Sequence, residues 1–218
     1  MKFSDLEQEN TMAQWHPRFG AQDMEVVEHE RICDGFFKIG RLKIRHKLFE
    51  GGEIEIIREQ FQRDDAVCVL LFDPVRDAVL LIEQFRVGAI GKPGSPWLLE
   101  LVAGIVEPGE TAEDVASRES VEEAGVSISD IVPITRYLPS AGGSDEYVDL
   151  LCARVDSAQA GGVHGLAEEG EDILVHVLPF AEVCQLVADG TIDNAATIIA
   201  VQWLQINKQR LLQQWGCK

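Results

Sequence analysis

The chain has 218 residues, which is the length of one large domain or of one domain with a small appendage. Its apolar content of 46% is enough for a hydrophobic core and argues against a disordered protein. With 19 basic and 37 acidic residues, the formal net charge is -18. A surface of this sign repels phosphate groups, so we expect neither a nucleic-acid-binding protein nor one that coats anionic membranes.

Five cysteines are spread along the sequence without a CxxC pair or a zinc-binding spacing. Most of them stand in apolar runs, which is typical of small core residues in a protein of the reducing cytoplasm. The N-terminal residues lack the apolar segment of a signal peptide, and no apolar run approaches the roughly 18 residues of a membrane helix. We therefore predict a cytoplasmic protein without a membrane span.

The first part of the chain predicts an irregular start followed by strands. Residues 1–24 are polar and mixed, whereas residues 25–60 tend to alternate between apolar and polar side chains. This alternation predicts several short antiparallel strands, with Gly51-Gly52 as a hairpin turn. Further along, we expect strands at 66–72 and 78–85 around a turn at 73–77, a loop at 88–96, and a strand at 97–102.

The rest of the chain mixes helices with further strands. Thr111 is an expected N-cap and Gly125 an expected C-cap of a helix over residues 111–124. We then expect strands at 131–136, 147–155 and 172–178, and helices at 181–188 and 193–215. This order predicts an α/β (α+β) fold in which a mixed sheet is sandwiched by helices. We expect two domains, a small antiparallel β-region at 1–60 and a main domain at 61–218.

Three acids fall within five positions of the first helix, at Glu119, Glu122 and Glu123. At about 100° per residue, Glu119 and Glu123 lie about 40° apart and share a face with small apolar residues. A solvated charged face is the simplest interpretation of such a cluster. Carboxylates on a packing face must instead be paired or bind a cation, and Arg118, well around the helix, cannot neutralise all three. Ligands that are all oxygens suit Mg²⁺ or Mn²⁺.

A glycine loop precedes this helix at a fixed distance. The pattern from Gly104 to Val126 is G-x5-E-x7-R-E-x-x-E-E-x-G-V, which resembles the signature of the Nudix hydrolases. The chain departs from that family at Ser120, where an aliphatic residue is usual. The resemblance implies a Nudix fold and hydrolysis of a nucleoside diphosphate linked to another group, with Mg²⁺ as cofactor and Mn²⁺ as a possible substitute.

The same resemblance implies roles for the residues of the motif. It implies Glu119, Glu123 and the carbonyl group of Ala103 as metal ligands, with Glu122 as a further ligand. Arg118 and Glu110 of such enzymes support the loop and helix.

Further segments resemble the bacterial ADP-ribose pyrophosphatases, a subgroup of the family. Among them are Ile82–Arg86, Trp97–Glu100 and His164–Asp172. This similarity implies hydrolysis of ADP-ribose to AMP and ribose 5-phosphate by a homodimer with swapped N-terminal strands. Ser140-Ala141-Gly142 departs from the subgroup, which usually has a proline there.

The subgroup also implies a substrate site. It implies that Arg58 and Arg86 bind phosphate, that Glu59 accepts a hydrogen bond, and that Phe36 or Phe37 stacks on adenine. The residues implied near the terminal ribose are Ser140, Gly142 and Glu146. For the phenylalanines core packing is the competing interpretation, and for the arginines it is surface ion pairing.

An acidic, glycine-rich loop at 164–172 completes the expected machinery. The subgroup has its catalytic base in this loop, and Glu169 is the matching position. Glu171 is either an alternative base or an added metal ligand, whereas His164 is expected to anchor the loop.

Three alternatives to ADP-ribose hydrolysis stay open. The first is hydrolysis of another nucleoside diphosphate sugar such as GDP-mannose. The second is a non-catalytic module that binds ADP-ribose, and the third is a structural or interaction domain with an acidic helix.

Overall fold

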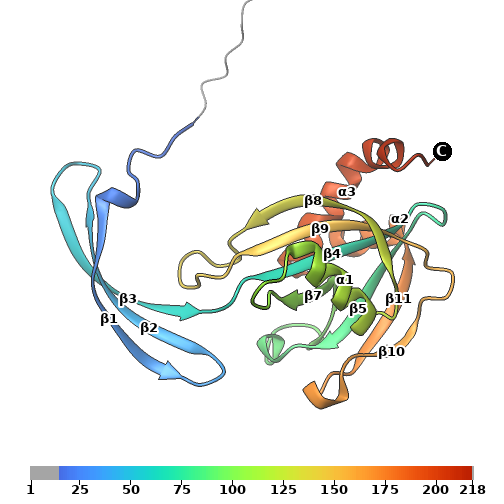
Figure 1. Cartoon of the computed structure of the whole chain (residues 1–218), viewed down its shortest axis with the longest axis horizontal. Coiled ribbons are helices and arrows are strands. Elements are labelled where there is room, and N and C mark those ends of the chain that lie inside the picture. The colour runs from blue at the N-terminus through green and yellow to red at the C-terminus, as the bar shows by residue number, and fades with distance from the viewer. Residues whose placement is uncertain (1–14, 218) are drawn as a thin grey trace, which may run out of the picture. The chain divides into compact units, whose positions relative to one another are not determined.

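The computed structural model describes residues 15–217, apart from the side chain of Glu169 (Figure 1). Most of the irregular start predicted for residues 1–24 lies outside these residues, and a 3-10 helix at Ala21–Asp23 belongs to its described part. Contacts divide the chain into two compact units, Met1–Phe61 and Gln62–Lys218.

The first unit is a three-stranded antiparallel sheet in the order β1-β2-β3. A hairpin turn joins β2 to β3, and its Gly51 and Gly52 have φ angles of 97° and 79°, which favour glycine. Charged side chains pair across the strands, since Arg45 donates to both Glu25 and Glu55. The strands are β1 (Met24–Asp34), β2 (Lys38–Lys47) and β3 (Glu53–Gln62).

The second unit is built around an eight-stranded mixed sheet. The main strand order is β10-β11-β5-β4-β9-β8, while β6 pairs with β5 and β7 pairs with β4. Strands β4 and β9 run parallel. The strands are β4 (Ala66–Asp73), β5 (Ala78–Phe85), β6 (Trp97–Glu100), β7 (Val102–Ile105), β8 (Ile128–Tyr137), β9 (Val148–Val155), β10 (Gly162–His164) and β11 (Ile173–Pro179).

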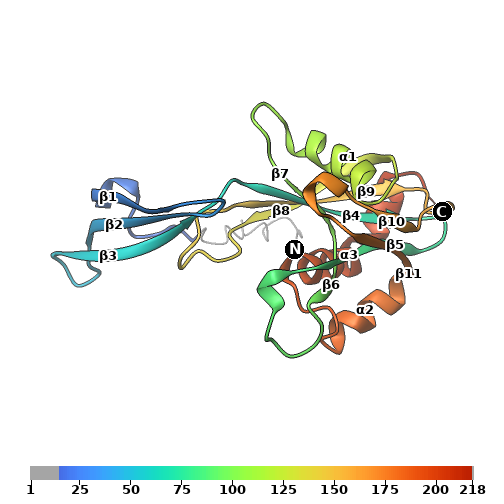
Figure 2. The same cartoon turned by 90° about the horizontal axis from the view of Figure 1, so that it is seen from below.

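Helices cover both faces of this sheet. Figure 2 shows α1 (Ala112–Glu122) on one side and α2 (Phe180–Ala188) and α3 (Ala195–Gln214) on the other. Strand β5 alternates between the two cores: Leu80 and Ile82 pack in the cluster that holds Val115 of α1, and Val79 and Leu81 pack in the α2–α3 cluster. The predicted sheet sandwiched by helices is therefore confirmed.

Several element boundaries differ from the prediction, and two of these differences bear on the site. The strand expected at 97–102 breaks at Leu101 into β6 and β7, because its two halves pair with different strands. Helix α1 ends at Glu122 with Glu123 as its C-cap, and Gly125 follows two residues later with a φ angle of 64°. The short strand β10 was not predicted.

Among residues 15–217, no helix is both long and apolar enough to cross a membrane.

Candidate active site

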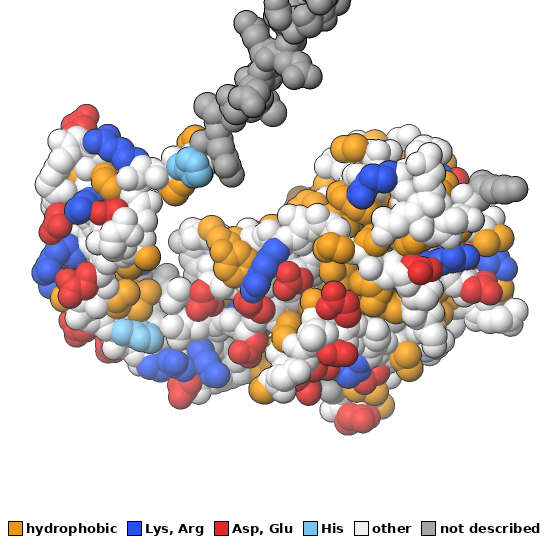
Figure 3. Space-filling view, turned by 45° about the horizontal axis from the view of Figure 1, so that its top comes forward, with side chains coloured by type: hydrophobic (Ala, Val, Ile, Leu, Met, Phe, Trp, Pro, Cys, Tyr) orange, Lys and Arg blue, Asp and Glu red, His pale blue; other side chains and the backbone are white. Residues whose placement is uncertain are grey.

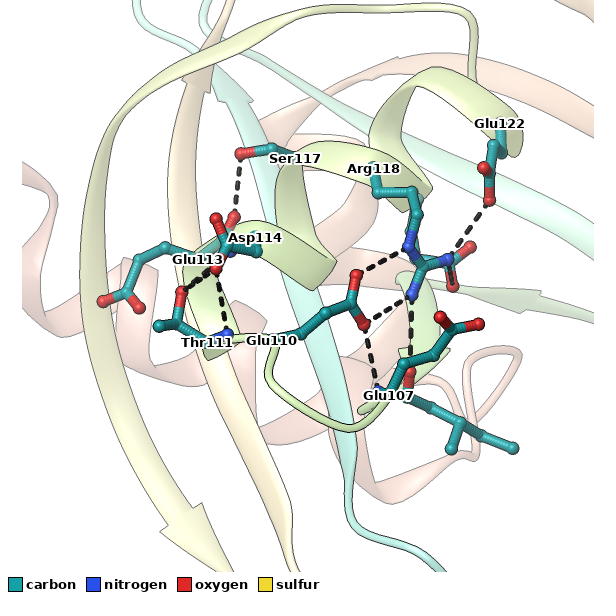
Figure 4. A network of polar contacts seen from close by, with 10 residues as sticks. Glu107, Glu110, Thr111, Glu113, Asp114, Ser117, Arg118 and Glu122 are labelled. Carbon is teal, nitrogen blue, oxygen red and sulfur yellow. Dashed lines mark hydrogen bonds and ion pairs between the residues drawn. The ribbon is translucent and has the colours of Figure 1, made fainter.

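Helix α1 starts at a capping box that fixes where its acids lie. The Thr111 hydroxyl accepts a hydrogen bond from the Asp114 backbone N–H, and the Asp114 carboxylate accepts one from the Thr111 N–H (Figure 4). Since the helix start is fixed directly after the glycine loop, the acids one and a half turns or more later turn toward β7.

Glu123 is the most buried acid of the helix, with 3% of its surface exposed. The Ala103 backbone N–H donates to its Oε2 at 2.9 Å, and this is the one hydrogen bond that the carboxylate makes with the residues that the structure describes. Burial raises the pKa of Glu123 to about 8, which the Ala103 hydrogen bond opposes and the charges of Glu119 and Glu171 reinforce. The predicted projection of this carboxylate onto the packing face is confirmed.

Glu119 lies against the backbone of β7. A Cβ atom at Gly104 would lie 1.8 Å from Glu119 Oε1, so only a glycine allows this approach. Burial raises the pKa of Glu119, and the nearby Arg118 opposes this rise. Gly104 is therefore required by the carboxylate and not by a backbone angle.

Arg118 holds the glycine loop to the helix. Its guanidinium group binds both carboxylate oxygens of Glu110, at 2.9 and 3.1 Å, and Glu110 also accepts the Glu107 N–H (Figure 4). A second branch of the guanidinium reaches Glu119 at 2.7 Å and Glu122 at 3.2 Å. Arg118 thus pairs with two of the three clustered acids and leaves Glu123 without an ion pair, as expected.

The loop after β10 brings a further acid to this cluster. Gly165 N–H donates to the Glu122 carbonyl oxygen at 3.2 Å, which ties the loop to the end of α1. Glu171 accepts the Leu166 N–H, and its charge raises the pKa values of Glu119 and Glu123. Four carboxylates of the described chain therefore lie within electrostatic range of one another.

The donor chemistry of this cluster fits a hard divalent cation. All the side-chain donors are oxygens, and Glu123 is buried with a raised pKa. Gly104 has no side chain, which leaves room for the Glu119 carboxylate beside β7. In the described residues, no three His, Cys, Asp or Glu side chains stand close enough together to bind one ion. Arg118 occupies Glu119 and Glu122 in this arrangement, so it competes with a cation for the same oxygens.

Two parts of the acidic loop can be placed. The backbone of Glu169 ends the 3-10 helix Ala167–Glu169, and Gly170 follows with a φ angle of 72°. The Glu169 side chain lies outside the described structure, so its role as the base stays a prediction. His164 Nε2 lies 3.0 Å from the Gly161 carbonyl oxygen, a contact that agrees with an anchoring role.

Arg86 stands near the same cluster, directly after β5. Its Nε donates to Glu100 Oε2 at 2.6 Å, and its charge opposes the rise in the pKa of Glu123 that burial causes. The sequence analysis did not assign a role to Glu100. An acid at the end of an apolar strand was the available signal, but its partner depends on the pairing of β6 with β5.

The predicted ribose-site residues lie between β8 and β9. The Ser140 carbonyl oxygen accepts N–H groups from Gly143 and Ser144, so Ser140 and Gly142 belong to a tight, exposed turn. Glu146 is buried, lies 3.4 Å from Arg63, and has a pKa raised by that burial.

The other predicted substrate residues belong to the first unit. Phe36 is 88% exposed and contacts Phe37 edge to face, with ring centroids 4.9 Å apart. Arg58 donates to the carbonyl oxygen of Ile57, and Glu59 pairs with Arg41 at 3.3 Å. These contacts leave Phe36 and much of Phe37 accessible, unlike ordinary core residues.

The family model described as "NUDIX domain" matches residues 62–211, which is more than half of the chain. The chain belongs to the NUDIX domain family. The carboxylate cluster on α1 therefore lies in the segment that defines NUDIX proteins, and the predicted family is confirmed.

Curated NUDIX relatives are similar over nearly the whole chain. An ADP-ribose pyrophosphatase of Escherichia coli (strain K12) is 46% identical over 199 residues, which cover 91% of this chain and 95% of the relative. An ADP-ribose pyrophosphatase of Haemophilus influenzae is 45% identical over 201 residues, with 90% and 93% covered. A GDP-mannose pyrophosphatase of Yersinia pestis is 30% identical over 185 residues, with 84% and 92% covered.

A solved structure shares the fold. The crystal structure of an ADP compounds hydrolase has a TM-score of 0.64 and 19% identity, and covers 86% of this chain and 97% of its own. The NUDIX fold is thus supported by structure as well as by sequence.

Proposed function

We propose that this NUDIX protein hydrolyses the pyrophosphate of ADP-ribose to AMP and ribose 5-phosphate with a bound divalent cation. The observation that carries the proposal is the buried Glu123 carboxylate beside Glu119, against the Ala103–Gly104 backbone. Similarity to two ADP-ribose pyrophosphatases, at 46% and 45% identity, supports the choice of substrate.

Mg²⁺ is the proposed cofactor, and Mn²⁺ is expected to replace it. The residues that would hold the cation are Glu119, Glu123 and the carbonyl group of Ala103, with Glu122 and Glu171 as further ligands. A bound cation would neutralise phosphate oxygens and lower the pKa of a water molecule.

Residues of the acidic loop are proposed to take the proton of the attacking water, and residues of the motif to keep the site in place. Glu169 is proposed to take the proton of the attacking water, and Glu171 is the alternative base. The hydrogen bond from Leu166 N–H to Glu171 supports the second role, since it holds this carboxylate beside the α1 acids. Arg118 and Glu110 fix the glycine loop, which keeps Gly104 against Glu119.

The substrate contacts implied by the similarity to ADP-ribose pyrophosphatases are proposed as well. Arg86 and Arg58 would bind the phosphate groups, because a guanidinium fork matches phosphate oxygens, and Glu59 would accept a hydrogen bond. Phe36 or Phe37, both of which are exposed, would stack on the adenine. Ser140, Gly142 and Glu146 would contact the terminal ribose.

The first unit is proposed to form a homodimer by strand exchange, while residues 61–218 form the hydrolase domain. Every residue of β1 is exposed, which is unusual for a strand unless another protein surface covers it. Five free cysteines fit a cytoplasmic protein. Acidic and basic side chains are mixed on the face in Figure 3, which supports a small-molecule substrate over nucleic acid or membrane.

Hydrolysis of GDP-mannose is the second candidate, supported by the 30% identity to a GDP-mannose pyrophosphatase and by Ala141 in place of proline. A non-catalytic ADP-ribose module is disfavoured, because every acid of the motif is present.

A substrate panel tests the proposal. Purified protein with Mg²⁺ should release AMP and ribose 5-phosphate from ADP-ribose, with a higher kcat/KM than for GDP-mannose. EDTA should stop the reaction. If ADP-ribose with Mg²⁺ gives no AMP, the proposed function is refuted. A higher kcat/KM for GDP-mannose would make GDP-mannose the preferred substrate in place of ADP-ribose.

A further inference from the structure

Glu100 lies on the α1 face of the sheet, although the mechanism above gives it no role. It is the register partner of Ile82 across β5 and β6, and directly opposed side chains share one face. Ile82 packs in the core that holds Val115 of α1. Glu100 therefore points toward the same side of the sheet as the candidate metal site.

The contact between Glu100 and Arg86 uses a particular nitrogen. Glu100 Oε2 accepts from Arg86 Nε at 2.6 Å, at the inner edge of the guanidinium group. Among the described residues, which leave out the side chain of Glu169, the two terminal amino groups of Arg86 have no hydrogen-bond partner. The pair therefore fixes the orientation of the guanidinium plane and leaves its outer fork available to an anion.

The backbone of Arg86 is held as well. Its N–H donates to the Pro96 carbonyl oxygen at 2.8 Å, and its own carbonyl oxygen accepts the Ala89 N–H. Both the backbone and the guanidinium group of Arg86 are thus fixed to the β5–β6 segment. This reduces the conformational entropy that the side chain loses on binding an anion.

The pair also belongs electrostatically to the site. Arg86 opposes the burial-driven rise in the pKa of Glu123, and the pKa of the Cys68 thiol on β4 is raised by desolvation and by the charges of Glu100 and Glu123. Ion pairs with one solvent-accessible partner, such as Arg86 here, contribute little to folding, so stability alone does not account for a carboxylate at this position.

We propose that Glu100 is a positioning residue, which holds Arg86 through Nε so that its terminal amino groups face the substrate pyrophosphate. This inference rests on the proposed function, because it takes Arg86 to bind phosphate. Glu100 is not expected to touch the reacting atoms.

Steady-state kinetics of Glu100→Ala with ADP-ribose tests the inference. We expect KM to rise about tenfold while kcat changes much less, since a loosely held arginine weakens binding of ground state and transition state alike. Glu100→Gln keeps an acceptor for Nε and should recover part of the loss. In an Arg86→Ala background, Glu100→Ala should have no further effect, because Glu100 acts through that arginine.

Glu83 provides a matched control on the opposite face of β5. Its carboxylate pairs with His176 at 2.8 Å and lies outside the candidate site, so Glu83→Gln should leave KM unchanged. An unchanged KM in Glu100→Ala, or an equal loss in the Arg86→Ala background, would overturn the inference. If Glu100→Ala is unstable to heat, the nearly isosteric Glu100→Gln decides instead: loss of the charge should still raise KM part of the way, and an unchanged KM would overturn the inference. A wild-type protein that does not hydrolyse ADP-ribose would refute the proposed function instead.

Discussion

Two buried carboxylates of the second unit have opposite properties. Asp73, in the β4–β5 turn, is 1% exposed, and Glu123, at the end of α1, is 3% exposed. Burial would raise the pKa of Asp73, but hydrogen bonds from Ser157 and Arg76 lower it below its ordinary value. Glu123 accepts only the Ala103 N–H from the described residues, and its pKa rises to about 8.

The number of donors accounts for much of the difference, since both residues are almost fully excluded from solvent. Asp73 accepts from Val75, from Arg76 through both backbone and side chain, and from Ser157 through N–H and hydroxyl. It is a satisfied structural anion. Glu123 is a buried carboxyl group whose charged form lacks compensating donors, which is the condition expected of a carboxylate that binds a cation.

The comparison is tested most strongly by Glu123→Gln. The amide keeps the shape and the acceptor for Ala103 but loses the charge, so kcat for ADP-ribose should fall on the order of 10³-fold. Initial rates with saturating Mg²⁺ measure this effect. A rate within a few-fold of wild type would mean that Glu123 does not take part in the chemistry.

Asp73→Asn should have the opposite effects, with a loss of stability and no loss of kcat. Loss of the charge weakens five hydrogen bonds, and the free energy of unfolding should fall by about 3 kcal/mol. Urea unfolding measures the loss. The kcat of the folded variant should match wild type, and a loss of kcat comparable to that of Glu123→Gln would remove the distinction between the two sites.

Gly104→Ala tests whether the β7 backbone shapes the carboxylate pair. A Cβ at 1.8 Å from Glu119 Oε1 must displace that carboxylate, so activity should fall about 10²-fold. Gly109→Ala is a useful control for backbone strain, because Gly109 has a φ angle of 94° and its Cβ would meet no atom within 4 Å. Because Gly104 is not among the residues with a positive φ angle, equal losses in both variants would show that any added methyl group in the glycine loop, and not contact with Glu119, lowers activity.

The pH dependence of stability should also separate the two acids. Glu123 has an ordinary pKa of 4.5, which is raised to about 8 in the folded protein. In EDTA, its contribution to the free energy of unfolding should therefore fall as the pH rises from 4.5 to about 8. Asp73 has a lowered pKa, so its contribution is complete above 3.8 and is lost as the pH falls below that value. Urea unfolding of wild type and each variant across pH should therefore give differences with opposite slopes, and parallel slopes would contradict the assignment.

The sequence predicted one of these sites far better than the other. The α1 acids follow from a local pattern, because helical spacing and the Thr111 cap determine which face Glu119 and Glu123 share. The environment of Asp73 depends on Ser157, 84 residues away, so no local pattern contains it. The Glu100–Arg86 pair and the break at Leu101 could not be predicted for the same reason, because both depend on the pairing of β6 with β5 and of β7 with β4.

The most direct measurement is Mn²⁺ binding by titration calorimetry with wild type, Glu123→Gln and Asp73→Asn. We predict that Glu123→Gln weakens binding at least about tenfold, while Asp73→Asn binds like wild type. Equal Mn²⁺ affinity in wild type and Glu123→Gln would contradict the account, because the buried carboxylate would then have no cation to bind.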